Sequence, residues 1–197
     1  MVKWEDHEYI NYEGWRGVLR LFDPTAFENM KVVLEGAVYD RDFIGDILVI
    51  NRDEIVNLST MSRSYKIEME LKKPIVPISI SGAIELHASL KNLSSELLDA
   101  DNDDMHSGCT VNIFISFPKK LDEVNAEQLL NDLEKIWGDQ RIITVTTSDT
   151  VSKKMLPVTS SIYKVSFGRL VKEEQMDDLE DMVEYLIQSI QAVKIPG

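Results

Sequence analysis

Two neighbouring stretches of the chain alternate between apolar and polar residues, and no other feature restricts the fold as much. They are "RSYKIEMELKK" at residues 63–73 and "PISISGAIELHASLKN" at residues 77–92. Successive side chains of a β-strand point to opposite faces, so the alternation predicts two strands with one buried face each, joined by a turn or crossing at "PIVP". The residues assigned to the buried faces are Tyr65, Ile67, Met69, Leu71, Ile78, Ile80, Gly82, Ile84, Leu86, Ala88 and Leu90.

The segments before these strands give weaker signals. Asp23 followed by Pro24 is typical of a helix start, whereas "KVVLEGAVYD" at residues 31–40 has the valine content of a strand. We therefore expect a short helix to about Met30 and then a strand. The stretch "DILVINRDEIVNL" predicts a hairpin of two short strands around the polar residues 51–54.

The second half alternates strands with helices. Strands are predicted at "TVNIFISF", "RIITVTT" and "SIYKVSFGRL". One helix is predicted to start with Asn125 and Gln128 as a cap pair and to stop at Gly138, and the last helix runs from Glu173 to about Lys194. This order resembles the split β-α-β arrangement of ferredoxin-like domains, except that the second half lacks the closing strand. The first half is the candidate source of that strand.

These elements predict an α+β protein with two parts. Residues 1–98 form a β-rich, largely antiparallel part, residues 99–109 an acidic connecting loop, and residues 110–197 a strand-helix-strand-strand-helix part. One continuous domain is the alternative, because 197 residues are an ordinary length for a single domain.

Charge restricts the classes of partner. The chain has 34 acidic and 21 basic residues, a formal net charge of −13, so its field repels phosphate backbones and anionic lipids. We expect no nucleic acid or membrane partner, and favour a basic protein surface. A single cysteine and the lack of any apolar run of about 18 residues indicate a soluble, cytoplasmic protein.

The segment "LLDADNDDMHSGC" at residues 97–109 is the first candidate metal site. Asp99, Asp101 and Asp103 are spaced like the start of a calcium loop, but neither the glycine nor the closing glutamate of that loop is present. His106 and Cys109 are too few soft ligands for structural zinc, and acidic neighbours do not activate a thiol. A solvated loop is the simpler interpretation, with weak cation binding as the alternative.

Three further groups are candidate binding sites. The last helix has an acidic face that includes Glu173, Asp177, Asp181 and Glu184. This face is either solvated or a docking surface for a basic partner.

Glu85 and His87 share one strand face. They form either an ordinary polar pair or part of a ligand pocket between the two halves. The aromatic residues of the N-terminal arm lie on the protein's own core or are exchanged in a homodimer, and they are Trp4, Tyr9, Tyr12 and Trp15.

No glycine-rich phosphate loop, nucleophile elbow or H-E-x-x-H motif occurs in the chain. The sequence therefore predicts no cofactor and no catalytic residue, and favours a non-catalytic interaction or regulatory module with an acidic docking face. The alternatives are a protein that binds a small ligand or cation between its halves, and an enzyme that uses scattered carboxylates.

Overall fold

The computed structural model describes residues 26–97, 106–154 and 156–195. These residues form an α+β fold around a six-stranded antiparallel sheet with the strand order β1-β2-β3-β4-β6-β5. The elements, in chain order, are α2 (Ala26–Ile44), β1 (Ile47–Asn57), β2 (Ser62–Leu71), β3 (Ser81–Ala88), α3 (Leu90–Leu97), β4 (Cys109–Phe117), α4 (Glu123–Trp137), β5 (Ile142–Thr150), β6 (Val158–Val171), the short 3₁₀ helix η2 (Glu173–Gln175) and α5 (Asp178–Ala192).

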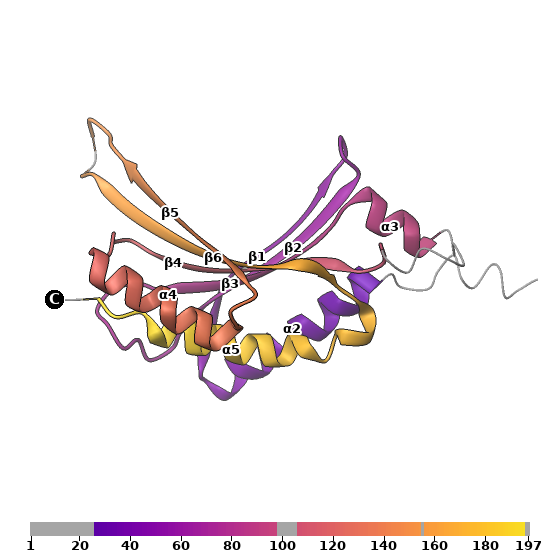
Figure 1. Ribbon diagram of the computed structural model, residues 1–197, viewed down its shortest axis with the longest axis horizontal. Coiled ribbons are helices and arrows are strands. Elements are labelled where there is room, and N and C mark those ends of the chain that lie inside the picture. Colours follow the sequence, from indigo (N-terminus) through magenta and orange to yellow (C-terminus); the bar gives the residue numbers. More distant parts are fainter. Residues whose placement is uncertain (1–25, 98–105, 155, 196–197) are drawn as a thin grey trace, which may run out of the picture.

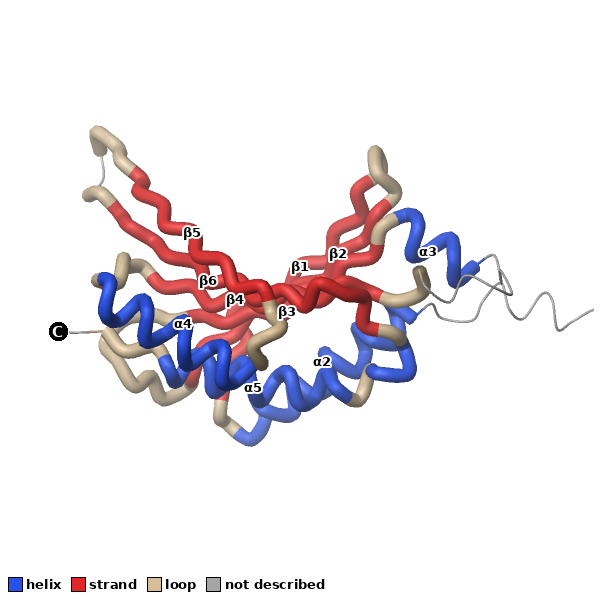
Figure 2. Tube along the Cα trace, viewed as in Figure 1, coloured by secondary structure: helices blue, strands red, loops and turns tan. Residues whose placement is uncertain are grey.

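The helices form one layer and the sheet the other. Helices α2, α4 and α5 lie on one side of the sheet, while α3 lies at the end of β3 (Figure 1). The outer hairpins β1–β2 and β5–β6 turn away from this helical layer, and the described helices leave the opposite, concave face uncovered (Figure 2). Within the described part of the chain, no helix combines the length and apolar character needed to cross a bilayer.

The alternating stretches form β2 and β3, as predicted. In β2, Tyr65, Ile67 and Met69 are buried while their neighbours are partly exposed, and Ile84 and Leu86 of β3 are buried opposite them. The prediction that the second strand includes Ile78, Ile80 and Leu90 is wrong, since β3 begins at Ser81 and ends at Ala88, and Leu90 is the first residue of α3. Two prolines in the preceding segment cannot donate backbone hydrogen bonds to a sheet ladder, so the segment forms a loop.

Two predictions for the first half are wrong. Residues 31–40 are not a strand, because α2 continues to Ile44. Its buried residues Met30, Leu34 and Val38 follow helical spacing, and packing against the sheet outweighs the weak strand preference of its valines. Residues 47–57 form one strand and not two, because the polar residues 51–54 pair in register with β2.

The split β-α-β order of the second half is confirmed. Strands β4 and β5 both pair antiparallel with β6, which lies between them, and β3 from the first half pairs with the free edge of β4 as the closing strand. Gly138 ends α4 with a φ of 90°, as expected. The predicted cap pair is wrong, because Asp122 caps α4 by accepting a hydrogen bond from the Asn125 backbone N–H at 2.9 Å.

Helix α5 lies across the centre of the sheet. The predicted apolar stripe is confirmed, since Leu179, Val183 and Leu186 are buried along this helix. The predicted start at Glu173 is wrong, because α5 begins at Asp178 and Glu173 belongs to η2. Gly82 of β3 allows the close approach, because a Cβ atom there would lie 2.6 Å from Leu186 Cδ1. The Trp137 indole of α4 donates a hydrogen bond to the buried Ser189 hydroxyl of α5 at 2.9 Å.

A charge network joins α2 to the β1–β2 hairpin. Glu54 of β1 accepts hydrogen bonds from Lys31 of α2 at 2.9 Å and from Arg63 of β2 at 2.6 Å, and Arg63 also pairs with Glu28 at 2.6 Å. The hydrogen bond from Lys31, followed by that from Arg63, lowers the pKa of the Glu54 carboxyl. The network therefore stabilises the hairpin only while Glu54 is ionised.

Substituting Glu54→Gln is expected to reduce the acid sensitivity of folding. A lowered carboxyl pKa stabilises the folded state above the unfolded-state value of about 4.5, and this contribution is lost as the pH falls through the folded-state value. The variant should lose about 1 kcal/mol or less at pH 7, since partly exposed ion pairs contribute little, and its stability should fall less steeply below about pH 5. Urea unfolding across this pH range measures both effects.

The matched control is Glu127→Gln on α4, an exposed glutamate with no ion pair to any described residue. It should retain the wild-type pH dependence. Equal pH dependence of the Glu54→Gln variant and wild type would contradict the role given to the network.

Candidate functional site

A groove runs between the C-terminal half of α2 and the N-terminal half of α5. Its volume is about 480 Å³, and its lining residues are Ala37, Asp40, Arg41, Phe43, Ile44, Glu180, Asp181, Val183 and Glu184. Both helices turn their apolar stripes toward the sheet, so the residues beside each stripe form the walls of the groove.

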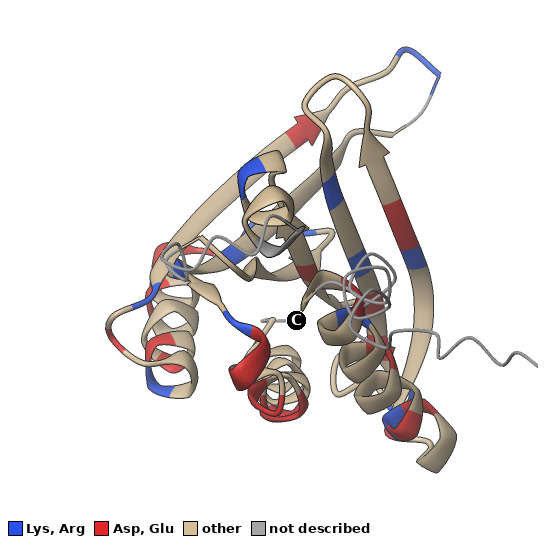
Figure 3. Cartoon of the chain, turned by 90° about the vertical axis from the view of Figure 1, so that its right-hand side faces the viewer, with Lys and Arg blue, Asp and Glu red and all other residues tan. Residues whose placement is uncertain are grey.

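The groove is acidic. Four carboxylates line it against one guanidinium, a formal excess of three negative charges. Arg41 bridges the two helices by pairing with Glu184, and its second terminal nitrogen lies 3.4 Å from Asp46. The side chains of Asp40, Glu180 and Asp181 are exposed. Figure 3 shows Asp and Glu residues on the helices, and the first turn of α5 contains Asp178, Glu180 and Asp181.

An apolar rim accompanies these charges. Phe43 is 92% exposed and the adjacent Ile44 is 62% exposed at the end of α2. An aromatic ring beside carboxylates is suited to arginine or lysine, because the ring face attracts the cation while the carboxylates accept charge-assisted hydrogen bonds. The groove thus has the chemistry to hold a basic segment with apolar neighbours.

Two further cavities extend this groove along α5. The middle cavity, about 380 Å³, shares Glu184 with the groove and shares Leu71 and Ile75 with a pocket of about 240 Å³ under the β2–β3 loop. Because neighbouring cavities share lining residues, the three lie in a row along α5, and this row is the track, acidic at one end and apolar at the other.

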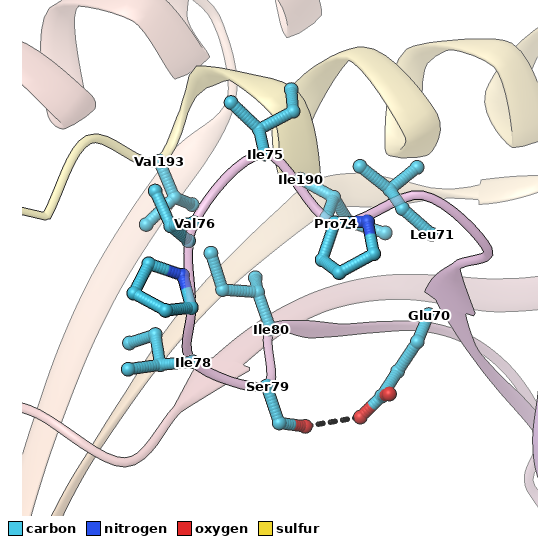
Figure 4. A pocket seen from close by; sticks show the side chains of 11 residues that line it. Glu70, Leu71, Pro74, Ile75, Val76, Ile78, Ser79, Ile80, Ile190 and Val193 are labelled. Carbon is cyan, nitrogen blue, oxygen red and sulfur yellow. Dashed lines mark hydrogen bonds between the residues drawn. The ribbon is translucent and has the colours of Figure 1, made fainter.

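The pocket at the apolar end is shown in Figure 4. The loop from Pro74 to Ile80 curves around it, and Ile190 and Val193 from the end of α5 close its other side. Glu70 and Ser79 point toward one another at the edge, where the Ser79 hydroxyl donates a hydrogen bond to the carboxylate. The run of prolines and isoleucines is the sequence signal for this pocket, but its pattern by itself favours a connection and part of a strand.

The predicted acidic docking residues are divided by the structure. Asp181 and Glu184 line the groove. Asp177 lies at the start of α5, and Glu173 in η2 accepts a hydrogen bond from Asn29 of α2 at 2.6 Å, so both lie outside the groove. Residues 37–44 complete the groove, and sequence reasoning missed them because it placed residues 37–40 in a strand and assigned no element to residues 41–44.

Glu85 and His87 lie together on the uncovered face of the sheet, as predicted from their spacing. Neither lines the groove or the pocket. The Asn112 amide donates to Glu85 at 3.0 Å and accepts from the Ser166 hydroxyl at 3.0 Å. Phe114 on the same face lies 5.2 Å from the Lys66 ammonium group, measured to the ring centroid.

The remaining candidates do not assemble a site in the described residues. Asp99, Asp101, Asp103 and the aromatic arm lie outside them. Cys109 is buried at the start of β4, and the His106 carbonyl accepts a hydrogen bond from the Asn92 amide at 2.9 Å. Within the ranges that the structure covers, no three His, Cys, Asp or Glu side chains are grouped to hold a metal ion.

Comparison with known proteins found no match to this chain among family models, curated proteins or solved structures.

Proposed function

We propose that the protein is a non-catalytic interaction module that binds a basic segment of a partner protein along α5. One observation carries the proposal: exposed carboxylates and the exposed Phe43 ring line the same groove, at one end of a track that finishes in an apolar pocket. The expected partner segment has arginine or lysine residues for the groove and an aliphatic side chain for the pocket.

The charge of the chain supports this choice of partner. A net charge of −13 accelerates encounter with positive surfaces and disfavours nucleic acid. Because three of the four groove carboxylates are exposed, their attraction is screened by ions, and the complex should weaken as salt is added. Phe43 and the pocket supply the part of the binding energy that does not depend on salt.

Charge reversal in the groove tests the proposal. The probe is a fluorescein-labelled peptide with a short arginine run followed, several residues on, by two leucines. The double substitution Asp40→Lys with Asp181→Lys should weaken its binding at least about tenfold, because two favourable charge contacts become repulsive. Fluorescence anisotropy at low salt measures the dissociation constant.

The control places the same charge change elsewhere. Glu127→Lys with Glu134→Lys, both exposed on α4, alters the net charge equally but should weaken binding by no more than about threefold. Phe43→Ala should weaken binding several-fold without changing the charge. If the two double variants lost equal affinity for the peptide, the groove would act only as part of a general acidic surface. That result would refute the site.

A small-ligand protein is the second candidate function. The observation that favours it is the apolar pocket of about 240 Å³ with one carboxylate at its edge, which suits a compact apolar amine. Binding of such a ligand would depend on the pocket residues and not on Asp40 or Asp181, so the same variants separate the two functions.

A further inference from the structure

The sheet has two edges, formed by β1 and β5. An edge strand leaves alternate backbone N–H and C=O groups without a strand partner, and an unprotected edge pairs readily with another strand. Within the described residues, neither edge pairs with a further strand, but the two edges differ in the features that prevent pairing.

The β1 edge is protected. Its register with β2 shifts between Val49 and Asn51, which marks a bulge or irregularity that interrupts a regular edge. Arg52, Asp53 and Glu54 occupy the middle of this 11-residue strand. If two copies paired antiparallel about the central residue, two Arg52 side chains would lie opposite each other, which is unfavourable.

The β5 edge has no such protection. Its nine residues pair with β6 without a register shift, and every residue except Ile143 is exposed. Ile142 and Val145 are 58% and 43% exposed. Asp149 is the single charged residue of the strand, and its carboxylate accepts a hydrogen bond from Thr159 of β6 at 2.6 Å.

We propose that two copies of the chain pair through their β5 edges, antiparallel and about a twofold axis at Thr146. Thr146 is the middle residue of β5, so this register pairs the whole strand. It places Thr144 opposite Ser148, a favourable cross-strand pair, and Val145 opposite Thr147. Asp149 faces Ile143 and not a second carboxylate, so no like charges meet when the partner strand belongs to a second copy.

The position of β5 in the fold is compatible with the same occupant. The β5–β6 hairpin turns away from the helical layer, and physiological salt screens exposed charges beyond about 8 Å, so two acidic copies tolerate this approach (Figure 1).

The dimer joins the two sheets into one and keeps both helical layers on the same side. Because β1 is protected, pairing closes after two copies and does not continue into a filament. One strand edge buries less surface than a standard interface, so an affinity on the order of micromolar is expected.

Charge at the twofold axis tests the register. In sedimentation velocity over about two decades of concentration, the wild-type chain should pass from monomer to dimer. Thr146→Lys and Thr146→Glu should each weaken dimerisation at least about tenfold, because like charges then face each other across the axis. An equimolar mixture of the two variants should dimerise again, since lysine then faces glutamate.

The control is Ile55→Lys, an exposed position on the β1 edge, which should leave the dimer unchanged. Rescue by mixing also shows that the single variants are folded. A wild-type chain that stays monomeric over the whole concentration range would overturn the proposal. The β5 edge would then be available to an extended segment of another protein. A dimer that resists Thr146→Lys would overturn it too, and would use another surface.

Discussion

A chain truncated before Glu173 is expected to show no cooperative thermal unfolding transition. The truncation removes α5, whose buried apolar residues pack on β3, β4 and α2, and these residues are Leu179, Met182, Val183, Leu186, Ile187 and Ile190. Burying each such side chain contributes about 1.5 to 3 kcal/mol, so their sum is comparable to the whole stability of a typical domain, about 5 to 15 kcal/mol. Differential scanning calorimetry measures the transition.

A point substitution separates packing from chain length. Leu186→Ala should cost about 2 to 5 kcal/mol, because Leu186 is fully buried against the site of Gly82. The matched control Gln188→Ala, on the exposed side of the same helix, should stay within about 0.5 kcal/mol of wild type. If the truncated chain kept a sharp transition, the sheet and the other helices would form a sufficient core without α5.

Replacing Gly108 with alanine is the second change with a large expected effect. Gly108 precedes β4 with a φ of +116°, and a Cβ atom there would lie 2.4 Å from the Val171 carbonyl oxygen of β6. That atom is backbone, so the two strands must separate where Cys109 pairs with Val171. Strained backbone costs about 1 to 3 kcal/mol and steric overlap about as much again, so we expect a loss of about 2 to 6 kcal/mol in urea unfolding.

The same chemical change elsewhere should have the opposite sign. Gly36 lies within α2, and a Cβ atom added there would meet no side chain or neighbouring element within 4 Å, so Gly36→Ala should stabilise the protein by about 0.5 to 1 kcal/mol. A Gly108→Ala variant as stable as wild type would mean that the start of β4 relaxes without separating from β6.

Local patterns predicted the strands and helices whose environment is uniform along their length. Strands β2, β4 and β6 have one covered and one uncovered face, so their alternation was visible in the sequence. Helix α2 was missed beyond Met30 because its hydrophobic pattern is weak and its valines favour a strand. Only contacts with β1, β3 and α5 make the helix the more stable conformation there.

The candidate site could be predicted only on one side. The acidic residues of the last helix were recognised, yet the sequence did not indicate that Asp181 and Glu184 face α2 while Asp177 and Glu173 do not. Parts of the opposite wall and of the apolar pocket come from segments whose local patterns favour strands. A groove is formed by two helices that are far apart in the chain, and periodicity within either helix carries no information about the other.

The sequence by itself determined the α+β class, the alternating faces of β2 and β3, the apolar stripe of α5 and the excess of negative charge. These properties follow from residues that are neighbours in the chain, where side-chain direction repeats with the period of the backbone. Tertiary structure alone decided that β3 joins the two halves through β4, that α2 and α5 form an acidic groove, and that β5 is left as an unprotected edge. Each of these depends on which elements come together in space, and that choice is made by the packing of the whole core.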